Sequence, residues 1–208
     1  PDMYLANTAQ IANQGNRWWI NQGGDQGGAP GFFVDESASR WIDLGGAGSS
    51  IAPSLLLPNA TSPETFIDWS CDSDFGDLDG DGDLDLLVVN HHEGKHLASA
   101  LLSGEFTAAH SNRLFLNQGG GRFAEEALPA VFAEGYTFVG VLEDLDGDGV
   151  DDLYAVNDFG AQWTPNVLLS GATGQPADVP GLDVVLYGMG AAMGDINGDG
   201  VVDLAMTS

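Results

Sequence analysis

Short apolar runs separated by turns recur along the chain. Three of them, LDLLVVN, DLYAVN and DLAMTS, directly follow acidic, glycine-rich loops, and their shortness and partly β-branched character predict strands. An apolar stretch that contains glycine precedes the second and the third loop, as YTFVGVLED and LYGMGAAMGD. The pattern therefore predicts a strand on each side of these loops.

A second phrase follows the strands. It reads NRLFLNQGGGRFAEEA at 112–127 and occurs earlier as NRWWINQGG and GFFVDESA within 16–38, while a fainter copy, NVLLSGATG, begins at Asn166. Each full copy predicts a strand, a glycine-rich turn and another strand. The two phrases together define a unit of four short strands.

Repeated units of this kind are typical of propeller blades. We therefore predict an all-β fold of β-propeller blades, each a four-stranded antiparallel sheet that carries an acidic loop. Residues 1–208 are predicted to form a single segment, about three to four blades of a larger propeller, with units that end near 38, 127, 180 and beyond 208.

The acidic loops fit one pattern, D-x-[DN]-x-D-G-x-x-D. Oxygen ligands at alternating positions can converge on one cation, the position-7 carbonyl adds another oxygen, and glycine at position 6 permits the sharp turn. The sequence therefore predicts three Ca²⁺ sites. Their ligands are Asp77, Asp79, Asp81, the carbonyl of Asp83 and Asp85; Asp144, Asp146, Asp148, the carbonyl of Val150 and Asp152; and Asp195, Asn197, Asp199, the carbonyl of Val201 and Asp203.

Neither an ordinary turn nor an EF-hand explains these loops. Asp and Gly dominate ordinary tight turns, but a turn does not need acids in fixed phase in three separate copies. An EF-hand requires a bidentate Glu at position 12 and a following helix. Position 12 is instead Val88, Ala155 or Met206, and a predicted strand follows each loop.

The sequence DGDLDLLVVN followed by NRLFLNQGGGRFAEEA resembles the FG-GAP (VCBS-type) repeats of integrin-like β-propellers. It is especially similar to bacterial relatives of the cartilage acidic protein group. The tripeptide GAP is absent from its expected place, and only DFG at 74–76 and 158–160 matches that name. The resemblance implies a calcium-braced propeller outside the cytoplasm that serves adhesion, recognition or assembly, with no enzymatic activity.

The two ends of the chain fall inside this unit. Pro1-Asp2 followed by MYLAN aligns with Asp151-Asp152 followed by LYAVN, so Asp2 takes position 9 of a fourth calcium loop, of which it is a remnant. Ser208 falls in the equivalent strand of the last unit. Because such ends would leave strand edges unpaired, we expect a segment of a longer polypeptide whose ring is completed by further sequence or by neighbouring chains.

Composition narrows the class of partner. The net charge is −26, and 11 of the 31 acids stand at predicted side-chain ligand positions. The remaining acids would repel nucleic acid, and no run is long enough to span a membrane. Loops of this kind fill where calcium is millimolar, which favours an extracellular, cell-surface or periplasmic location. The single cysteine, Cys71, is expected to be a buried, unreactive thiol.

The histidines after the first loop and the aromatic side chains give weaker indications of function. His91, His92, Glu93 and His96 could offer nitrogen ligands to a transition metal, but their spacing favours a solvated loop. The aromatic side chains are expected to pack between blades, with a sugar-binding surface as the alternative; they are Trp18, Trp19, Phe32, Phe33, Trp41, Trp69 and Trp163. No nucleophile elbow, P-loop or dinucleotide fingerprint is present, so we predict no enzyme.

The sequence thus predicts a calcium-binding module for proteins or glycans, in adhesion or assembly. Two alternatives stay open. One is a subunit of an extracellular filament or multiprotein complex, whose partners are neighbouring copies or other subunits. The other is the non-catalytic part of a secreted hydrolase.

Overall fold

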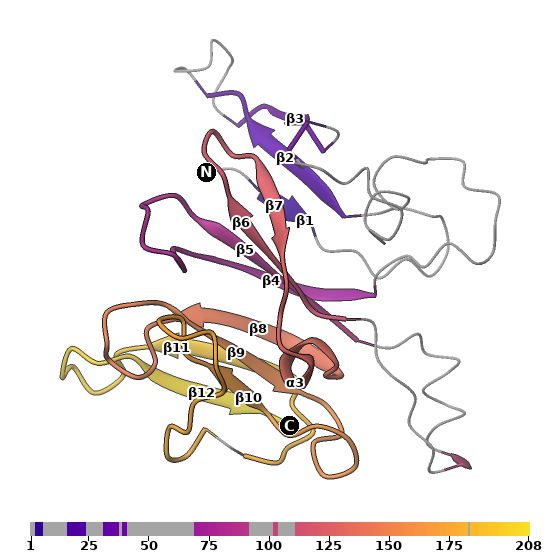
Figure 1. The fold of residues 1–208 in the computed structure, drawn as a ribbon, viewed down its shortest axis with the longest axis vertical. Coiled ribbons are helices and arrows are strands. Elements are labelled where there is room, and N and C mark those ends of the chain that lie inside the picture. The colour runs from indigo at the N-terminus through magenta and orange to yellow at the C-terminus, as the bar shows by residue number, and fades with distance from the viewer. Residues whose placement is uncertain are drawn as a thin grey trace.

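The fold is taken from a computed structural model, which describes residues 3–5, 16–23, 31–37, 39–40, 69–91, 102–103, 111–182 and 184–208. The chain is all-β, as predicted, and is built of several small antiparallel sheets. Figure 1 shows these sheets arranged one after another from the N-terminal to the C-terminal part of the chain. Within the described ranges no closed barrel or propeller forms.

The central sheet has the four strands that the sequence predicts. They are β4 (Ser70–Gly76), β5 (Asp85–Asn90), β6 (Arg113–Asn117) and β7 (Phe123–Glu126), hydrogen-bonded in the order β4-β5-β6-β7. The glycine-rich turn between β6 and β7 contains Gly119, Gly120 and Gly121, all with positive φ. Because glycine adopts this region without steric penalty, the turn can close tightly.

The other sheets show fewer strands. One contains β1 (Met3–Leu5), β2 (Arg17–Asn21) and β3 (Phe33–Asp35), and another contains β8 (Thr137–Glu143), β9 (Asp152–Asn157) and β10 (Val167–Leu169). The last contains β11 (Gly190–Gly194) and β12 (Asp203–Thr207). A short helix, α3 (Ala130–Ala133), connects the central sheet to β8.

Equivalent strands pair in the same register. Leu86, the residue after position 9 of the first acidic loop, pairs with Phe115, which lies three residues after Asn112. Leu153 pairs in the same way with Leu169, three residues after Asn166, and Met3 pairs with Trp19, three residues after Asn16. β4 and β8 also share an irregularity in register near their beginnings. It lies between Ser70 and Asp72 in β4 and between Thr137 and Val139 in β8.

The sheets are stacked face to face, so the middle strands are buried on both sides. All six residues of β5 are buried; Leu86 and Val88 pack in a cluster with Trp18, while Leu87 and Val89 pack in a cluster with Leu153. β9 is buried in the same way between the central sheet and β11–β12. Burying each such side chain stabilises the fold by about 1.5–3 kcal/mol, which explains the continuous apolar runs.

A buried polar network joins the sheets at the end away from the acidic loops. Asn16 donates to the Ser70 hydroxyl (2.9 Å), which donates to Oδ1 of Asn90 (2.8 Å). In the next sheet Asn112 donates to the Thr137 hydroxyl (2.7 Å), which donates to Oδ1 of Asn157 (2.7 Å). Asn16, just before β2, and Asn112, just before β6, therefore each bind the first strand of the next sheet.

Trp18, Phe32 and Cys71 differ in how deeply they are buried. Trp18 is buried and stacks on Phe123 with ring centroids 4.6 Å apart, so it packs between sheets as predicted. Phe32 is instead 66% exposed. Cys71 is half-buried in β4, and burial, followed by the charge of Asp72, raises the pKa of its thiol to about 12, consistent with the expected low reactivity.

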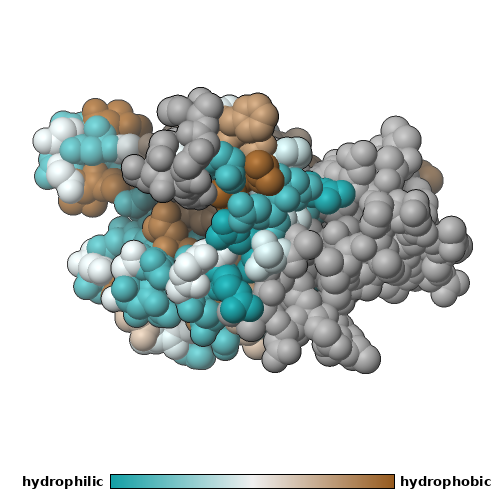
Figure 2. Space-filling view, turned by 90° about the horizontal axis from the view of Figure 1, so that it is seen from above, coloured by the Kyte–Doolittle hydropathy of each residue, from teal (hydrophilic) through white to brown (hydrophobic). Residues whose placement is uncertain are grey.

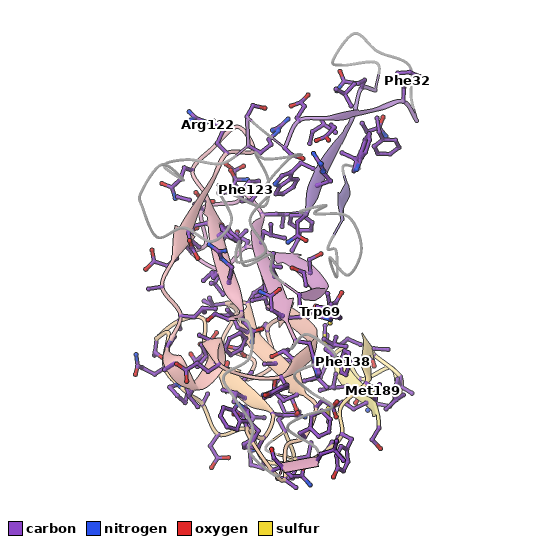
Figure 3. The ribbon with its side chains drawn as sticks, turned by 90° about the vertical axis from the view of Figure 1, so that its right-hand side faces the viewer. Phe32, Trp69, Arg122, Phe123, Phe138 and Met189 are labelled. Atoms are coloured by element: carbon purple, nitrogen blue, oxygen red, sulfur yellow. The ribbon has the colours of Figure 1, made fainter. Side chains whose placement is uncertain are left out.

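The prediction of a solvated loop after β5 is wrong for His91. Its side chain is buried, stacks on Phe138 with centroids 4.2 Å apart, and lies 3.6 Å from the carboxylate of Asp158. Figure 3 shows Trp69, Phe138 and Met189 one below another along the side of the molecule where the first strands of three sheets lie. His92, Glu93, His96, Trp41 and Asp2 lie outside the described residues.

Candidate metal centres

Each acidic loop connects the first two strands of a sheet. β4 ends at Gly76, which pairs with Asp85, so the first loop closes between directly opposed residues; Glu143 and Asp152, and Gly194 and Asp203, are paired in the same way. Strands, not helices, follow all three loops, as the sequence predicted against the EF-hand. The paired strands thus hold both ends of every loop.

Glycines at positions 4 and 6 allow the three loops to fold alike. The φ angles at position 4 are +75° at Gly80, +80° at Gly147 and +78° at Gly198. At position 6 they are +90° at Gly82, +90° at Gly149 and +87° at Gly200. A side chain at these positions would be strained, because residues with a Cβ rarely adopt this region. The sequence pattern identified position 6; position 4 has the same requirement.

Four side-chain to backbone hydrogen bonds are common to all three loops. The backbone N–H at position 2 donates to the side chain at position 9, and that at position 5 donates to position 3. The N–H at position 6 donates to position 1, and that at position 7 donates to position 5. In the first loop, for example, Gly82 donates to Oδ2 of Asp77 at 3.0 Å. Each ionised carboxylate has further acceptor sites that these bonds leave available to a cation.

Carboxylate oxygens converge in the first two loops. Ligand atoms of Asp77, Asp79 and Asp85 lie within 4.8 Å of one another, and so do those of Asp144, Asp146 and Asp148. Acids this close repel one another strongly without a cation. Asp81 and Asp152 complete the predicted carboxylate sets from the same two loops but stand outside these tighter groups.

One buried carboxylate oxygen in the first loop is suited to bind a metal ion. Oδ1 of Asp77 is buried and has no hydrogen-bond partner among the residues described, whereas Oδ2 accepts from Gly82. A buried acceptor left without a partner costs about 1–3 kcal/mol. A divalent cation bound at position 1 would satisfy it, so the residues present fit calcium at this loop.

The aspartate at position 9 fixes the loop to the sheet. Asp85 is fully buried, and its two oxygens accept from Leu78 (3.0 Å) and from Asn117 in β6 (2.8 Å). Asp152 accepts in the same way from Leu145 and Gly171, both at 3.0 Å. Burial raises the pKa of both carboxyls despite these hydrogen bonds. Position 9 is therefore a structural anchor whether or not it also binds the cation.

The third loop differs in exposure and charge. Asp195, Asn197 and Asp199 are all exposed, and within the part of the chain that the structure describes, groups of three close carboxylates occur only in the other two loops. Backbone N–H groups, first that of Gly200, lower the pKa of Asp195. Asn197 could offer a cation only a neutral amide oxygen, so this loop has one carboxylate fewer at the predicted ligand positions.

Further acids lie beside the loops, and the D-x-[DN]-x-D-G-x-x-D pattern did not identify them. Asp74 in β4 accepts a hydrogen bond from Leu142 in β8 (3.0 Å), and Asp151 accepts one from Asp77 (3.0 Å). Both bonds join the central sheet to the next one. The sequence signal that could have identified Asp151 is its place at position 8 of the second loop, where the other two loops have the apolar residues Leu84 and Val202.

A cavity of about 460 Å³ lies between the central sheet and the sheet of β8, β9 and β10. Leucine side chains from both sheets form much of its wall, with Asp79 of the first loop and Val150 of the second at its border. On the face of the molecule that Figure 2 shows, hydrophobic side chains also gather in patches among hydrophilic ones. The cavity adds apolar surface next to the candidate metal centres.

Comparison with known proteins adds no assignment. No protein-family model matches the chain, and no curated protein matches it. Within the described ranges, no helix is long and apolar enough to cross a membrane.

Proposed function

We propose that this chain is a calcium-binding, all-β binding module that serves adhesion, recognition or assembly outside the cytoplasm. The observation that carries the proposal is the shared geometry of the three loops. Their hydrogen bonds and glycine conformations coincide, and the first loop also contains the buried, unpartnered Oδ1 of Asp77. Ordinary turns would not require this common arrangement of acidic side chains.

In this proposal the sheets are blades of an FG-GAP or VCBS-type propeller. The common strand register and the faces that pack on one another support that interpretation. Calcium neutralises the acids at the strand connections and so stabilises the stack. The ligand-binding role follows from the family resemblance, and the chain would have no catalytic activity of its own.

Exposed apolar side chains near the last sheet favour a protein partner. Val185, Tyr187 and Met189 are 53%, 49% and 55% exposed. They precede β11, and the hydroxyl of Tyr187 accepts a 2.8 Å hydrogen bond from Gln162, the residue before the partly exposed Trp163. Such residues are common where proteins associate, so assembly into a larger extracellular complex remains the second candidate function.

Thermal unfolding of the metal-free chain tests the proposal. If calcium is present at about 1 mM and the dissociation constant is about 0.1 mM, each occupied site adds about 1.4 kcal/mol to the free energy of unfolding. We expect calcium to raise the melting temperature and a chelator to reverse the change. An unchanged melting temperature in a chain shown to start metal-free would contradict the proposal.

A further inference from the structure

The second acidic loop contacts the first through Asp151. This residue occupies position 8, between the predicted ligands Val150 and Asp152. Its Oδ2 accepts a 3.0 Å hydrogen bond from the backbone N–H of Asp77, which is position 1 of the first loop. Val202, at position 8 of the third loop, has no side-chain oxygen with which to make the corresponding contact.

The backbone between the two sheets is shaped for this contact. A Cβ on Gly76 would lie 2.7 Å from Oδ2 of Asp151 and 2.8 Å from Cβ of Leu142, so only glycine fits there. On the neighbouring side, the Leu142 N–H donates to Oδ2 of Asp74 at 3.0 Å. Two side-chain to backbone bonds therefore hold the end of β4, one to β8 through Leu142 and one to the start of β9 through Asp151.

Asp151 also stands between two predicted ligands of the second loop, the carbonyl of Val150 and the carboxylate of Asp152. The Asp152 carboxylate is itself held by hydrogen bonds from Leu145 and Gly171, both at 3.0 Å. A cation bound by both neighbours would fix the backbone of Asp151, and would favour the placement in which its side chain holds the Asp77 backbone.

We propose that Asp151 couples the first two metal centres, so that calcium in the second loop raises the calcium affinity of the first. This inference rests on the proposed calcium binding. Asp151 is a positioning residue: it fixes the backbone of Asp77, and thereby the carboxylate with the buried Oδ1, without being a ligand of the first site. Linkage requires the first site to raise the affinity of the second by the same factor.

The loop glycines provide a separate readout for each site. The amide groups of Gly82, Gly149 and Gly200 donate to the position-1 aspartates of their own loops, so their NMR resonances report binding loop by loop. The experiment is a calcium titration of the whole chain, its Asp148→Ala variant, and the same pair in an Asp151→Val background. Val is matched to Val202, which occupies position 8 of the third loop.

We expect Asp148→Ala to raise the calcium midpoint at Gly82 by at least about fivefold in the natural background, and by less than about twofold in the Asp151→Val background. Asp151→Asn keeps an oxygen acceptor and should retain most of the coupling. Asp199→Ala, which removes the third site, should leave the Gly82 midpoint unchanged.

An unchanged Gly82 midpoint in Asp148→Ala would overturn the coupling, as would an equal rise in both Asp151 and Asp151→Val backgrounds. If Asp151→Val fails to fold, loss of coupling in Asp151→Asn would count against the hydrogen bond as its carrier. Calcium-induced shifts without coupling leave the proposed function intact, whereas no shift at any of the three glycines overturns both.

Discussion

The hydroxyl of Thr137 donates a 2.7 Å hydrogen bond to Oδ1 of Asn157, and Asn112 of the preceding sheet donates to the same hydroxyl at 2.7 Å. Thr137 and Asn157 are both buried and pair across β8 and β9. The hydroxyl thus connects the two strands of its own sheet with the sheet before it. Ser70 makes the equivalent bonds to Asn90 and Asn16.

Replacing Thr137 by Val should destabilise the chain. The change keeps the side-chain shape but leaves the amide of Asn112 and Oδ1 of Asn157 each without one buried partner, at a cost of about 1–3 kcal/mol. Urea unfolding measures the change in the free energy of unfolding. Thr137→Ser retains the hydroxyl and is the control; equal stability of the Val and Ser variants would show that the network contributes nothing.

Two glycines offer a matched test of the packing beside the loops. Gly76 and Gly194 both immediately precede an acidic loop and pair with its last aspartate. A Cβ on Gly76 would meet Asp151 and Leu142 at under 3.0 Å, whereas nothing lies within 4 Å of one on Gly194.

Gly76→Ala should therefore destabilise the chain by about 1–3 kcal/mol through overpacking, and Gly194→Ala should change its stability by less than about 0.5 kcal/mol. Parallel urea unfolding of the two variants measures both values. A Gly194→Ala variant as unstable as Gly76→Ala would contradict the close approach of the central sheet and the sheet of β8, β9 and β10 at Gly76.

The three sites should differ in affinity. The first and second loops each offer four carboxylates at side-chain ligand positions, and the third offers three because Asn197 replaces an aspartate. We expect the third site to be the weakest. Calcium titrations of chains that each lose one site, through Asp81→Ala, Asp148→Ala or Asp199→Ala, would rank them.

Asn197→Asp is the complementary test of the charge argument. It restores the missing carboxylate and should lower the calcium midpoint of the third site. A third site that is the tightest in the natural chain, or one that Asn197→Asp weakens, would refute the dependence on ligand charge.

Local sequence was sufficient to predict the loops and the strands beside them. The six buried residues of β5 have the sequence DLLVVN, in which the four apolar residues LLVV are continuous because both faces of the strand are covered. Likewise, the glycine in position 6 has a conformation that other residues rarely adopt. These features depend on residues close in sequence, so one chain contains enough information to identify them.

Contacts between sheets could not be predicted in this way. His91 precedes a polar stretch and was expected in solvent, but the neighbouring sheet supplies Phe138 and Asp158 and buries it. Asp151 stands at a position that the loop pattern leaves unspecified, and its partner Asp77 lies 74 positions away. Which strand ends meet is decided by the stacking of the sheets, which no local pattern specifies.

Isothermal titration calorimetry of calcium into the chelator-treated chain tests the central claim most directly. The account predicts three calcium ions per chain at saturation, because three complete loops share the binding geometry. The triple variant Asp81→Ala, Asp148→Ala, Asp199→Ala should release or absorb no binding heat under the same conditions. A natural chain that binds no calcium, or a triple variant that binds as much as the natural chain, would contradict the assignment of these loops as calcium sites.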